Sequence, residues 1–429
     1  MSAAAPAPAK KPSVWRAFAR PAAGTMLFFG FSSGLPFLLV AGTLALWLKD
    51  SGTELADITM ISSAGMMYVL KPLWAPLLDH WQLPGFGRLG RRRGWLLFAQ
   101  LGLAASLLAM AMLTPQNLVP FIGATLLVAF FGATQDIAVD AWRIEIAPLE
   151  SQGALVAVYS LGYRFGLMVS YAFALILADH MSWRSVYLLM AAAVLLPICA
   201  NLLAREPEAP HLPARPWSEA VYHAVVVPMV DLFQRYGLKL ALVTLLFILI
   251  FKIPEQATIA GIVSPFYRDM GFSKTEIGAV TKIYGVWIGI AGTFAGGAAV
   301  ARFGIWRPLL FAIVVCGLCN LLYLLLIAHP GDLAWFTLVI SGENFTLGML
   351  GPPTVAYLSS LVNREHTGTQ YSLLSALLNM PGKVVGFFAG SIVAATNYAT
   401  FFSLTTLAIP PAVALCLWLW SQDRRRGGE

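Results

Sequence analysis

Nine ionisable side chains lie inside long apolar stretches of the sequence, where they could bind or transfer charge. Five are basic and four are acidic: Lys71, Arg164, Lys252, Lys282 and Lys383, and Asp136, Asp140, Glu255 and Glu343. A lone ionised side chain in the middle of a bilayer costs about 2.5–3.5 kcal/mol or more, so it must line a cavity, pair with another charge or have a function. This set of residues therefore predicts a polar site inside a membrane protein.

The deepest of these residues carry more positive than negative charge. Near the middle of their stretches we expect Arg164, Lys252, Lys282 and Lys383 against Glu255 and Glu343. A net positive cavity favours an anionic or zwitterionic solute. Arginine binds a carboxylate or phosphate through two parallel hydrogen bonds, whereas lysine acts as a point charge. Arg164 and Lys383, which occupy equivalent positions in the two halves of the sequence, are the first candidates for substrate contacts. The alternative is that each only pairs with Glu343 or Glu255 to hold helices together.

Two shorter patterns indicate ion pairs or proton carriers. Lys252 and Glu255 are three residues apart and share a helix face, while Pro254 between them favours a kink. The motif is therefore either a hinge with an internal ion pair or a coupling site.

Asp136 and Asp140 are one helical turn apart, and two nearby carboxylates raise each other's proton affinity, as a proton-coupled carrier requires. Alternatively, Asp140 pairs with Arg143 at the membrane surface and only Asp136 is buried, beside Lys71.

The elements that must position these residues are membrane-spanning helices. Of 429 residues, 58% are hydrophobic and 11% are charged, and the apolar blocks exceed the roughly 20 residues that cross a hydrocarbon core. Twelve spans are predicted, near residues 24–48, 56–78, 94–113, 117–140, 151–178, 182–204, 237–265, 273–300, 308–328, 332–362, 367–396 and 398–421. The first is too long for the apolar region of a signal peptide and is expected to be retained.

The predicted organisation is two six-helix halves, 24–204 and 237–421. A cytoplasmic tail (1–23), a cytoplasmic linker with an amphipathic helix (205–236) and a second tail (422–429) complete the chain. The loops and tails on the side of the termini hold 19 Lys and Arg residues and the opposite loops hold four. Because positive residues are retained in the cytoplasm, both termini are expected to be cytoplasmic. The net charge of +7 is therefore interpreted as a topology signal, with no nucleic-acid partner.

The two halves look related, which predicts the major facilitator fold. An offset of 219 residues aligns Gly52 with Gly271, Arg88 with Arg307, and Arg164 with Lys383 among other pairs, and two six-span halves in parallel repeat are typical of that all-α fold. The loop between spans two and three resembles the Asp…Gly-Arg-Arg signature of the same superfamily. Its residues Asp79, Arg88, Arg91 and Arg92 form a predicted gate, although the arginines could serve only as a topology signal.

Cofactor and enzyme chemistry are not expected. The four cysteines, Cys199, Cys316, Cys319 and Cys416, lie inside apolar segments, so we expect no disulfide framework and treat the Cys316/Cys319 pair as structural. The six histidines fall in loops or at span ends, which leaves no ligands for a buried metal or haem and no base for a nucleophile. The sequence predicts a monomeric transporter without cofactor or metal. Its expected partners are a small anionic solute, protons and the lipid bilayer.

Several longer runs resemble one family, the AmpG-type muropeptide permeases of the major facilitator superfamily. These runs are 29–36, 90–95, 133–142, 161–164, 342–344 and 369–377. The resemblance implies a bacterial inner-membrane importer of anhydro-muropeptides (GlcNAc-anhydroMurNAc with or without a stem peptide), driven by protons, for cell-wall recycling. It carries over functional positions at Gln135, Asp136, Asp140, Tyr163, Arg164, Glu343, Asn344 and Gln370.

Combined with the residue patterns, the resemblance gives a set of expected roles. Substrate binding is expected at Gln135, Tyr163, Arg164, Lys252, Glu343, Asn344, Gln370 and Lys383, and proton coupling at Asp136, Asp140 and Glu255. Some family members are longer, with extra hydrophobic segments. Acetyl-CoA transporters share part of the pattern, so another anionic or amphipathic solute such as acyl-CoA, or drug export, remains an alternative.

Overall fold

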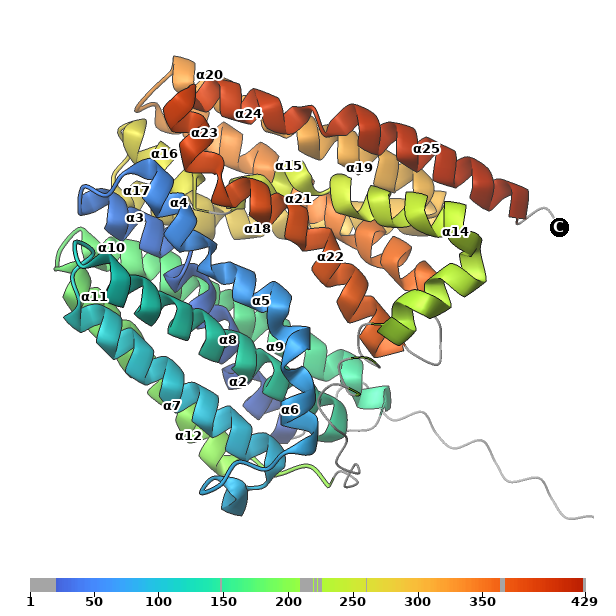
Figure 1. Ribbon diagram of the computed structural model, residues 1–429. Coiled ribbons are helices and arrows are strands. Elements are labelled where there is room, and N and C mark those ends of the chain that lie inside the picture. Colours follow the sequence, from blue (N-terminus) through green and yellow to red (C-terminus); the bar gives the residue numbers. More distant parts are fainter. Residues whose placement is uncertain are drawn as a thin grey trace, which may run out of the picture.

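Helices joined by short turns make up the protein. The computed structural model describes residues 21–146, 149–208, 219, 222, 226–259, 261–362 and 367–426, and no β-strand occurs among them. Figure 1 shows two groups of helices side by side, residues 21–208 in one and residues 226–426 in the other. This arrangement confirms the predicted all-α fold.

The first half contains six spans, several of them interrupted. Its elements are α2 (Pro21–Leu39), α3 (Gly42–Asp50), α4 (Leu55–Ser62), the 3-10 turn η1 (Ser63–Met66), α5 (Met67–Leu70), the 3-10 turn η2 (Lys71–Leu73), α6 (Ala75–His80), the 3-10 turn η3 (Gly87–Leu89), α7 (Arg91–Met112), α8 (Leu118–Ile146), α9 (Leu149–Met168), the π-helical segment η4 (Val169–Phe173), α10 (Ala174–Ala178), α11 (Trp183–Ala193) and α12 (Leu195–Leu203).

The second half repeats the six spans with breaks of its own. It contains α14 (Val227–Ile250), α15 (Ile253–Ile259), α16 (Val263–Asp269), α17 (Lys274–Gly278), the π-helical segment η6 (Ala279–Tyr284), α18 (Gly285–Phe303), α19 (Trp306–Cys319), α20 (Leu322–Ala328), α21 (Leu333–Leu361), α22 (Thr367–Phe387), α23 (Ala389–Ala395), α24 (Tyr398–Thr406) and α25 (Ile409–Arg426). The break between α14 and α15 falls directly before Pro254, as the sequence predicted.

Eleven of the twelve predicted spans are helical segments long and apolar enough to cross a membrane within the described ranges. The second span is different, because residues 55–80 form α4, α5 and α6 separated by η1 and η2. Pro72 and Pro76 lie in this part of the chain and cannot donate backbone hydrogen bonds. Figure 1 shows these short helices following one another along the first half between α3 and α7.

The predicted internal repeat agrees with the backbone at matching turns. Gly52 and Gly271, aligned by the 219-residue offset, both adopt positive φ, of 79° and 92°. The same offset aligns Gly85 with Gly304, and these too have positive φ, of 83° and 74°. Since side chains strongly disfavour this region and glycine does not, the two halves use the same turn chemistry after their first and second spans.

The linker prediction falls mostly outside the described residues. Most of residues 209–225 are not described, so the start of the amphipathic helix at Trp217 is not tested. Its end is described: α14 already begins at Val227 and continues into the seventh span, with a non-helical residue at Gly237 (φ 74°, ψ 160°). Two helices therefore meet at Gly237, which is where the seventh span was predicted to begin.

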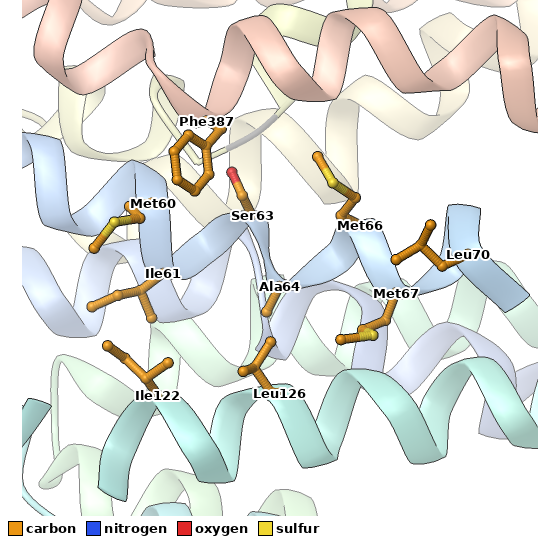
Figure 2. Close-up of a pocket in the computed structure, with 10 residues that line it drawn as sticks. All are labelled: Met60, Ile61, Ser63, Ala64, Met66, Met67, Leu70, Ile122, Leu126 and Phe387. Atoms are coloured by element: carbon orange, nitrogen blue, oxygen red, sulfur yellow. The ribbon is translucent and has the colours of Figure 1, made fainter. Parts of the chain in front are cut away.

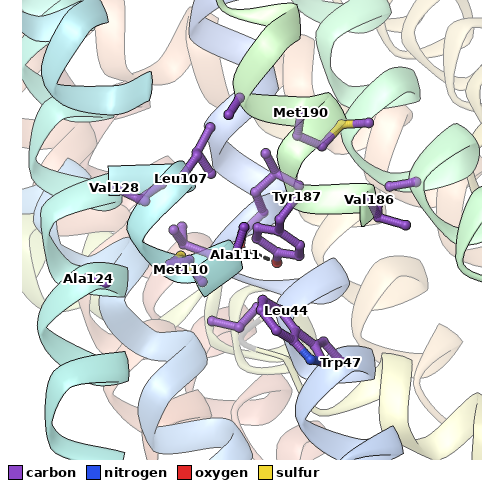
Figure 3. Packing of buried hydrophobic residues seen from close by; sticks show 14 of the residues in the cluster. Leu44, Trp47, Leu107, Met110, Ala111, Ala124, Val128, Val186, Tyr187 and Met190 are labelled. Carbon is purple, nitrogen blue, oxygen red and sulfur yellow. Dashed lines mark hydrogen bonds between the residues drawn. The ribbon is translucent and has the colours of Figure 1, made fainter. Parts of the chain in front are cut away.

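The core of the first half is packed by large apolar side chains. Trp47, Leu107, Met110 and Tyr187 belong to one buried cluster that joins α3, α7, α8 and α11, as Figure 3 shows. The Tyr187 hydroxyl donates to the carbonyl of Leu39 at 2.9 Å, which satisfies its polar end inside an apolar core. This packing gives the first half a rigid frame for the charged residues on η2 and α8.

Glycines bring α2 and α9 into backbone contact. A Cβ atom added to Gly162 would overlap the carbonyl of Leu27, and one added to Gly30 would overlap the carbonyl of Tyr159. Small residues four apart on facing helices allow this close approach. The Gly30/Gly34 and Gly162/Gly166 pairs identified in the sequence therefore pack against each other.

We expect Gly162→Ala to destabilise the protein, because the new methyl group must push α9 away from α2. Overpacking of this kind costs about 1–3 kcal/mol, which should lower the thermal unfolding midpoint in detergent. The matched control is Gly123→Ala on α8, where an added Cβ meets nothing within 4 Å. Equal unfolding midpoints for the two variants would contradict the backbone contact as the cause.

Candidate functional site

A buried carboxylate and a lysine face each other in the first half. The Lys71 ammonium lies 3.9 Å from Asp136 Oδ2, which forms an ion pair between η2 and α8. Asp136 Oδ1 is buried without a hydrogen-bond partner. Asp140, one turn later, is 47% exposed and pairs with Arg143 at 3.5 Å. Of the two arrangements that the sequence allowed, the structure has the one with a single buried aspartate beside Lys71.

Lys383 reaches from the second half to the first. Its Nζ donates to the carbonyl of Gly65 at 2.9 Å and lies 6.0 Å from the ring centre of Phe37. Gly65 belongs to the 3-10 turn η1, where the α-helical hydrogen-bond pattern of the second span is interrupted. Lys71 is within electrostatic reach of the same ammonium group. Lys383 therefore stands at the boundary between the halves, close to the Lys71–Asp136 pair.

Two hollows meet at this boundary. A small one of about 30 Å³ is lined by Lys383 and Gln256 from the second half and by Ser62 and Ser63 among others from the first. A larger, mostly apolar one of about 340 Å³ shares Ser63 and Met66 with it and extends along α4, α5 and α8 to Phe387. Figure 2 shows three methionines, Met60, Met66 and Met67, around it. An anionic group at Lys383 would thus have apolar space beside it.

The predicted Lys252–Glu255 pair is present in the second half. Lys252 Nζ lies 3.0 Å from Glu255 Oε1 across the break between α14 and α15. Glu343 on α21 lines the same small pocket as Glu255, and it accepts a long hydrogen bond of 3.5 Å from the Tyr267 hydroxyl. These residues form a polar centre within one half, separate from the contact of Lys383 with Gly65.

Arg164 makes no ion pair with any side chain that the structure describes. It lies on α9 and is partly buried, next to Tyr163, whose ring stands 6.2 Å from that of Tyr159. The structure gives no contact between Arg164 and Lys383, so the predicted pairing of the two across one site stays a prediction. An unpaired guanidinium inside a span is nevertheless available for an anion.

Three other expected substrate contacts have hydrogen-bond partners within the protein. The Gln135 amide bonds Ser32, accepting from its hydroxyl at 2.7 Å. Asn344 donates to the Ile340 carbonyl at 3.0 Å and packs against Gly285. Gln370, at the start of α22, donates to Asp231 and accepts from Arg235. Gln370 and Lys383 are thirteen residues apart on α22, about 20 Å along the helix axis.

Two arginines of the predicted gate, Arg91 and Arg92, bind a carboxylate on α8. Arg92, which is almost fully buried, binds Glu145 at the end of α8 through Nε and Nη2, and Arg91 Nη2 lies 3.5 Å from the same carboxylate. Glu206 accepts from the backbone amides of Arg92 and Arg93 at 2.8 and 3.0 Å. The Asp79 side chain lies outside the described atoms, and Arg88 makes no ion pair with the described side chains. Neither Glu145 nor Glu206 was singled out from the sequence.

Removing the Glu145 carboxylate should destabilise this end of the first half. Breaking a buried ion pair leaves an uncompensated charge and costs about 3–5 kcal/mol, so Glu145→Ala is expected to lower the unfolding midpoint strongly. Asp140→Ala removes a half-exposed partner of Arg143 near the end of the same helix and should cost less than about 1 kcal/mol. Thermal unfolding of both variants in detergent measures the difference, and similar losses would contradict it.

Ion pairs also join the two halves at one end, which we call the far end, formed by α3, α16 and α17. Asp50 accepts from Lys274 at 2.9 Å, and Lys49 lies 2.8 Å from Asp269. Asp179 accepts from the backbone amide of Thr275 at 2.7 Å. Figure 1 shows the halves converging at this end and diverging toward α6 and the start of α22. From the sequence, Lys49 and Lys274 had been interpreted only as part of the charge count of the loops.

Comparison with known proteins agrees with this architecture. Residues 22–386 match the Major Facilitator Superfamily. The chain is 36% identical over 404 residues to the anhydromuropeptide permease of Escherichia coli (strain K12), covering 94% of this chain and 80% of the relative. This chain belongs to the AmpG-type muropeptide permease family of that superfamily.

Solved structures show the same fold at low sequence identity. A POT family transporter in complex with 5-aminolevulinic acid matches with a TM-score of 0.71 at 11% identity, covering 94% of this chain and 96% of that one. The nucleoside transporter NupG matches with a TM-score of 0.68 at 13% identity, covering 93% and 99%. As a member of the AmpG-type family, the chain is a multi-pass membrane permease and not an enzyme.

Proposed function

We propose that this permease imports anhydro-muropeptides across the bacterial inner membrane for cell-wall recycling, coupled to protons and by alternating access. The similarity to the E. coli anhydromuropeptide permease, at 36% identity over 94% of the chain, supports the substrate class. Such cargo carries carboxylates, and lysine and arginine inside the spans suit an anion. Both termini are proposed to lie in the cytoplasm, with the far end facing the periplasm.

The observation that carries the proposal is the position of Lys383 between the halves. Its ammonium is held by a single backbone carbonyl, that of Gly65, and a carboxylate would bind it more strongly because the hydrogen bond would join two charges. Lys71 nearby adds positive charge. We propose Lys383 and Arg164 as substrate contacts, with Asp136 as the proton carrier. Gln135, Asn344 and Gln370 are proposed to keep helices in register.

Alternating access is supported by the unequal ends of the molecule. The far end is closed by charged pairs between the halves, while the helices diverge at the opposite end (Figure 1). In the proposed cycle, this conformation releases cargo to the cytoplasm. Opening of the far end would require Lys49, Asp50 and Lys274 to exchange their partners for water.

The apolar hollow beside Lys383 favours a second candidate function. About 340 Å³ lined mainly by Met, Leu and Ile side chains suits the chain of an amphipathic anion such as an acyl-CoA better than it suits a sugar. A small apolar part of a glycopeptide would also fit. The chemistry of the cargo therefore needs a direct comparison.

The test is an uptake screen in proteoliposomes with an imposed inward proton gradient. Labelled GlcNAc-anhydroMurNAc, its peptide-bearing form, an acyl-CoA and a lipophilic cation are compared at equal concentration. The proposal expects accumulation of the two muropeptides that collapses when a protonophore is added. Accumulation of acyl-CoA alone, or muropeptide uptake that ignores the protonophore, would contradict the substrate or the coupling respectively.

A further inference from the structure

A small pocket lies in the second half, between α15, α19 and α21. Its volume is about 20 Å³, which is enough for one sphere of the size of a water molecule. The residues that line it are Glu255, Thr258, Cys316, Cys319, Asn320, Glu343, Thr346 and Leu347. Two carboxylates and three neutral oxygen-bearing side chains thus surround space for one small ligand.

The neutral polar side chains of this pocket donate their hydrogen bonds to groups outside it. The Thr258 hydroxyl donates to the Glu255 carbonyl at 2.8 Å, and the Thr346 hydroxyl donates to the Gly342 carbonyl at 2.8 Å. The Asn320 amide nitrogen donates to the Pro254 carbonyl at 3.0 Å and to Thr405 at 2.8 Å. What these three side chains can offer the pocket is therefore oxygen lone pairs.

One carboxylate oxygen is left without a partner. Glu255 Oε1 is bound by Lys252 and by the Gln256 amide, both at 3.0 Å. Glu255 Oε2 is buried without a hydrogen-bond partner, and the side chain as a whole is only 8% exposed. An unsatisfied buried carboxylate oxygen is costly, and in an environment of acceptors only a positively charged or hydrogen-donating ligand can relieve that cost.

We propose that this pocket binds one monovalent cation of the size of sodium, with oxygen ligands from Glu255, Glu343, Thr258, Thr346 and Asn320. Sodium, like other hard cations, is held by oxygen. The pocket also lies at an interrupted helix, since turns at residues 251–252 and 261–262 lie on either side of α15, and broken spans are where transporters coordinate coupling ions. The inference goes beyond the proposed function, because it does not involve Asp136 or the muropeptide.

The surrounding charges favour a single positive charge over two. Lys252 pairs with Glu255, and Lys282 acts on Glu343 from η6, so much of the negative charge is already balanced. Tyr267 and Tyr323 face Glu343 from α16 and α20, Tyr171 on η4 lies within electrostatic reach of it, and the Cys316 and Cys319 thiols line the pocket. Within the described residues, no group of three or more His, Cys, Asp or Glu side chains could hold a metal ion, which argues against a transition-metal site.

The test measures sodium binding to the purified full-length protein without any muropeptide. Thermal unfolding is followed at fixed pH and ionic strength while NaCl replaces choline chloride, with KCl as the size control. A ligand that binds only the folded state raises the unfolding midpoint, so sodium should raise it and choline should not. Thr346→Val removes one oxygen ligand and should weaken the sodium response about ten-fold in concentration.

A matched control lies two turns further along α21. Thr354 is also buried and its hydroxyl donates to the carbonyl four residues earlier, that of Leu350, but it is not part of the pocket. Thr354→Val should keep the wild-type sodium response. A midpoint that depends on pH but not on sodium, or an equal shift in the two threonine variants, would overturn the proposal. Because no substrate is used, either result leaves the transport proposal standing.

Discussion

Substitution of Asp136 by Asn is expected to abolish proton-driven accumulation of the substrate while leaving substrate exchange intact. The buried carboxylate of Asp136 has one oxygen near Lys71 and one without a hydrogen-bond partner. A group in this position can be protonated and deprotonated as its surroundings change, whereas an amide cannot. The measurement is uptake into proteoliposomes with and without an inward proton gradient, alongside counterflow with substrate on both sides.

Asp140→Asn is the matched control for this experiment. Asp140 lies one turn from Asp136 on α8, but it is half exposed and pairs with Arg143. It should therefore retain gradient-driven accumulation close to that of the wild type. If Asp136→Asn still accumulates substrate against its gradient, the carboxylate of Asp136 is not the proton carrier.

The second large effect is expected from Lys383→Ala. Losing one hydrogen bond between two charged groups costs about 1.5–3 kcal/mol, a weakening of substrate binding by about ten-fold to about a hundred-fold. Transport measured over a range of substrate concentrations should show this loss as a higher half-saturation concentration. The same substitution of Arg164 tests the other proposed substrate contact.

Lys239→Ala provides a control in the same half. Lys239 lies on α14 with its ammonium 5.9 Å from the ring centre of Trp418, away from the Lys383–Gly65 contact. Its removal should leave the half-saturation concentration unchanged, and both lysine variants should keep the wild-type unfolding midpoint to within a few degrees. An unaltered substrate dependence in Lys383→Ala would remove this residue from the binding site.

The sequence was sufficient for the fold because the hydrocarbon solvent imposes a simple rule. Runs of about 20 apolar residues must be helices, since lipid offers no partner to an exposed backbone, and eleven spans appeared as expected. The local ion pair of Lys252 with Glu255 was also predictable, because residues three apart share a helix face. The sequence therefore predicted the features that depend on residues close together along the chain.

The roles of single polar residues were harder to predict, because they depend on contacts between distant segments. Gln135 lies in a motif that suggested substrate binding, yet its amide bonds Ser32, 103 residues away. Arg92 was expected to form a gate with Asp79, whose side chain is not described, and the structure adds Glu145 as a partner that the sequence did not single out. Rotation of a helix about its axis decides such partners, and hydropathy carries no information about it.

The broken second span has a consequence for the parity of membrane crossings. Eleven helical segments among the described residues are long and apolar enough to cross a membrane, and an odd number of crossings would put the two ends of the chain on opposite faces of the bilayer. In Figure 1, α25 ends on the side where the two halves diverge, and the proposal that both termini are cytoplasmic needs an even number of crossings. We therefore expect the interrupted segment from Leu55 to His80 to be the twelfth crossing, and tags on the two termini should respond alike to a protease that cannot cross the membrane.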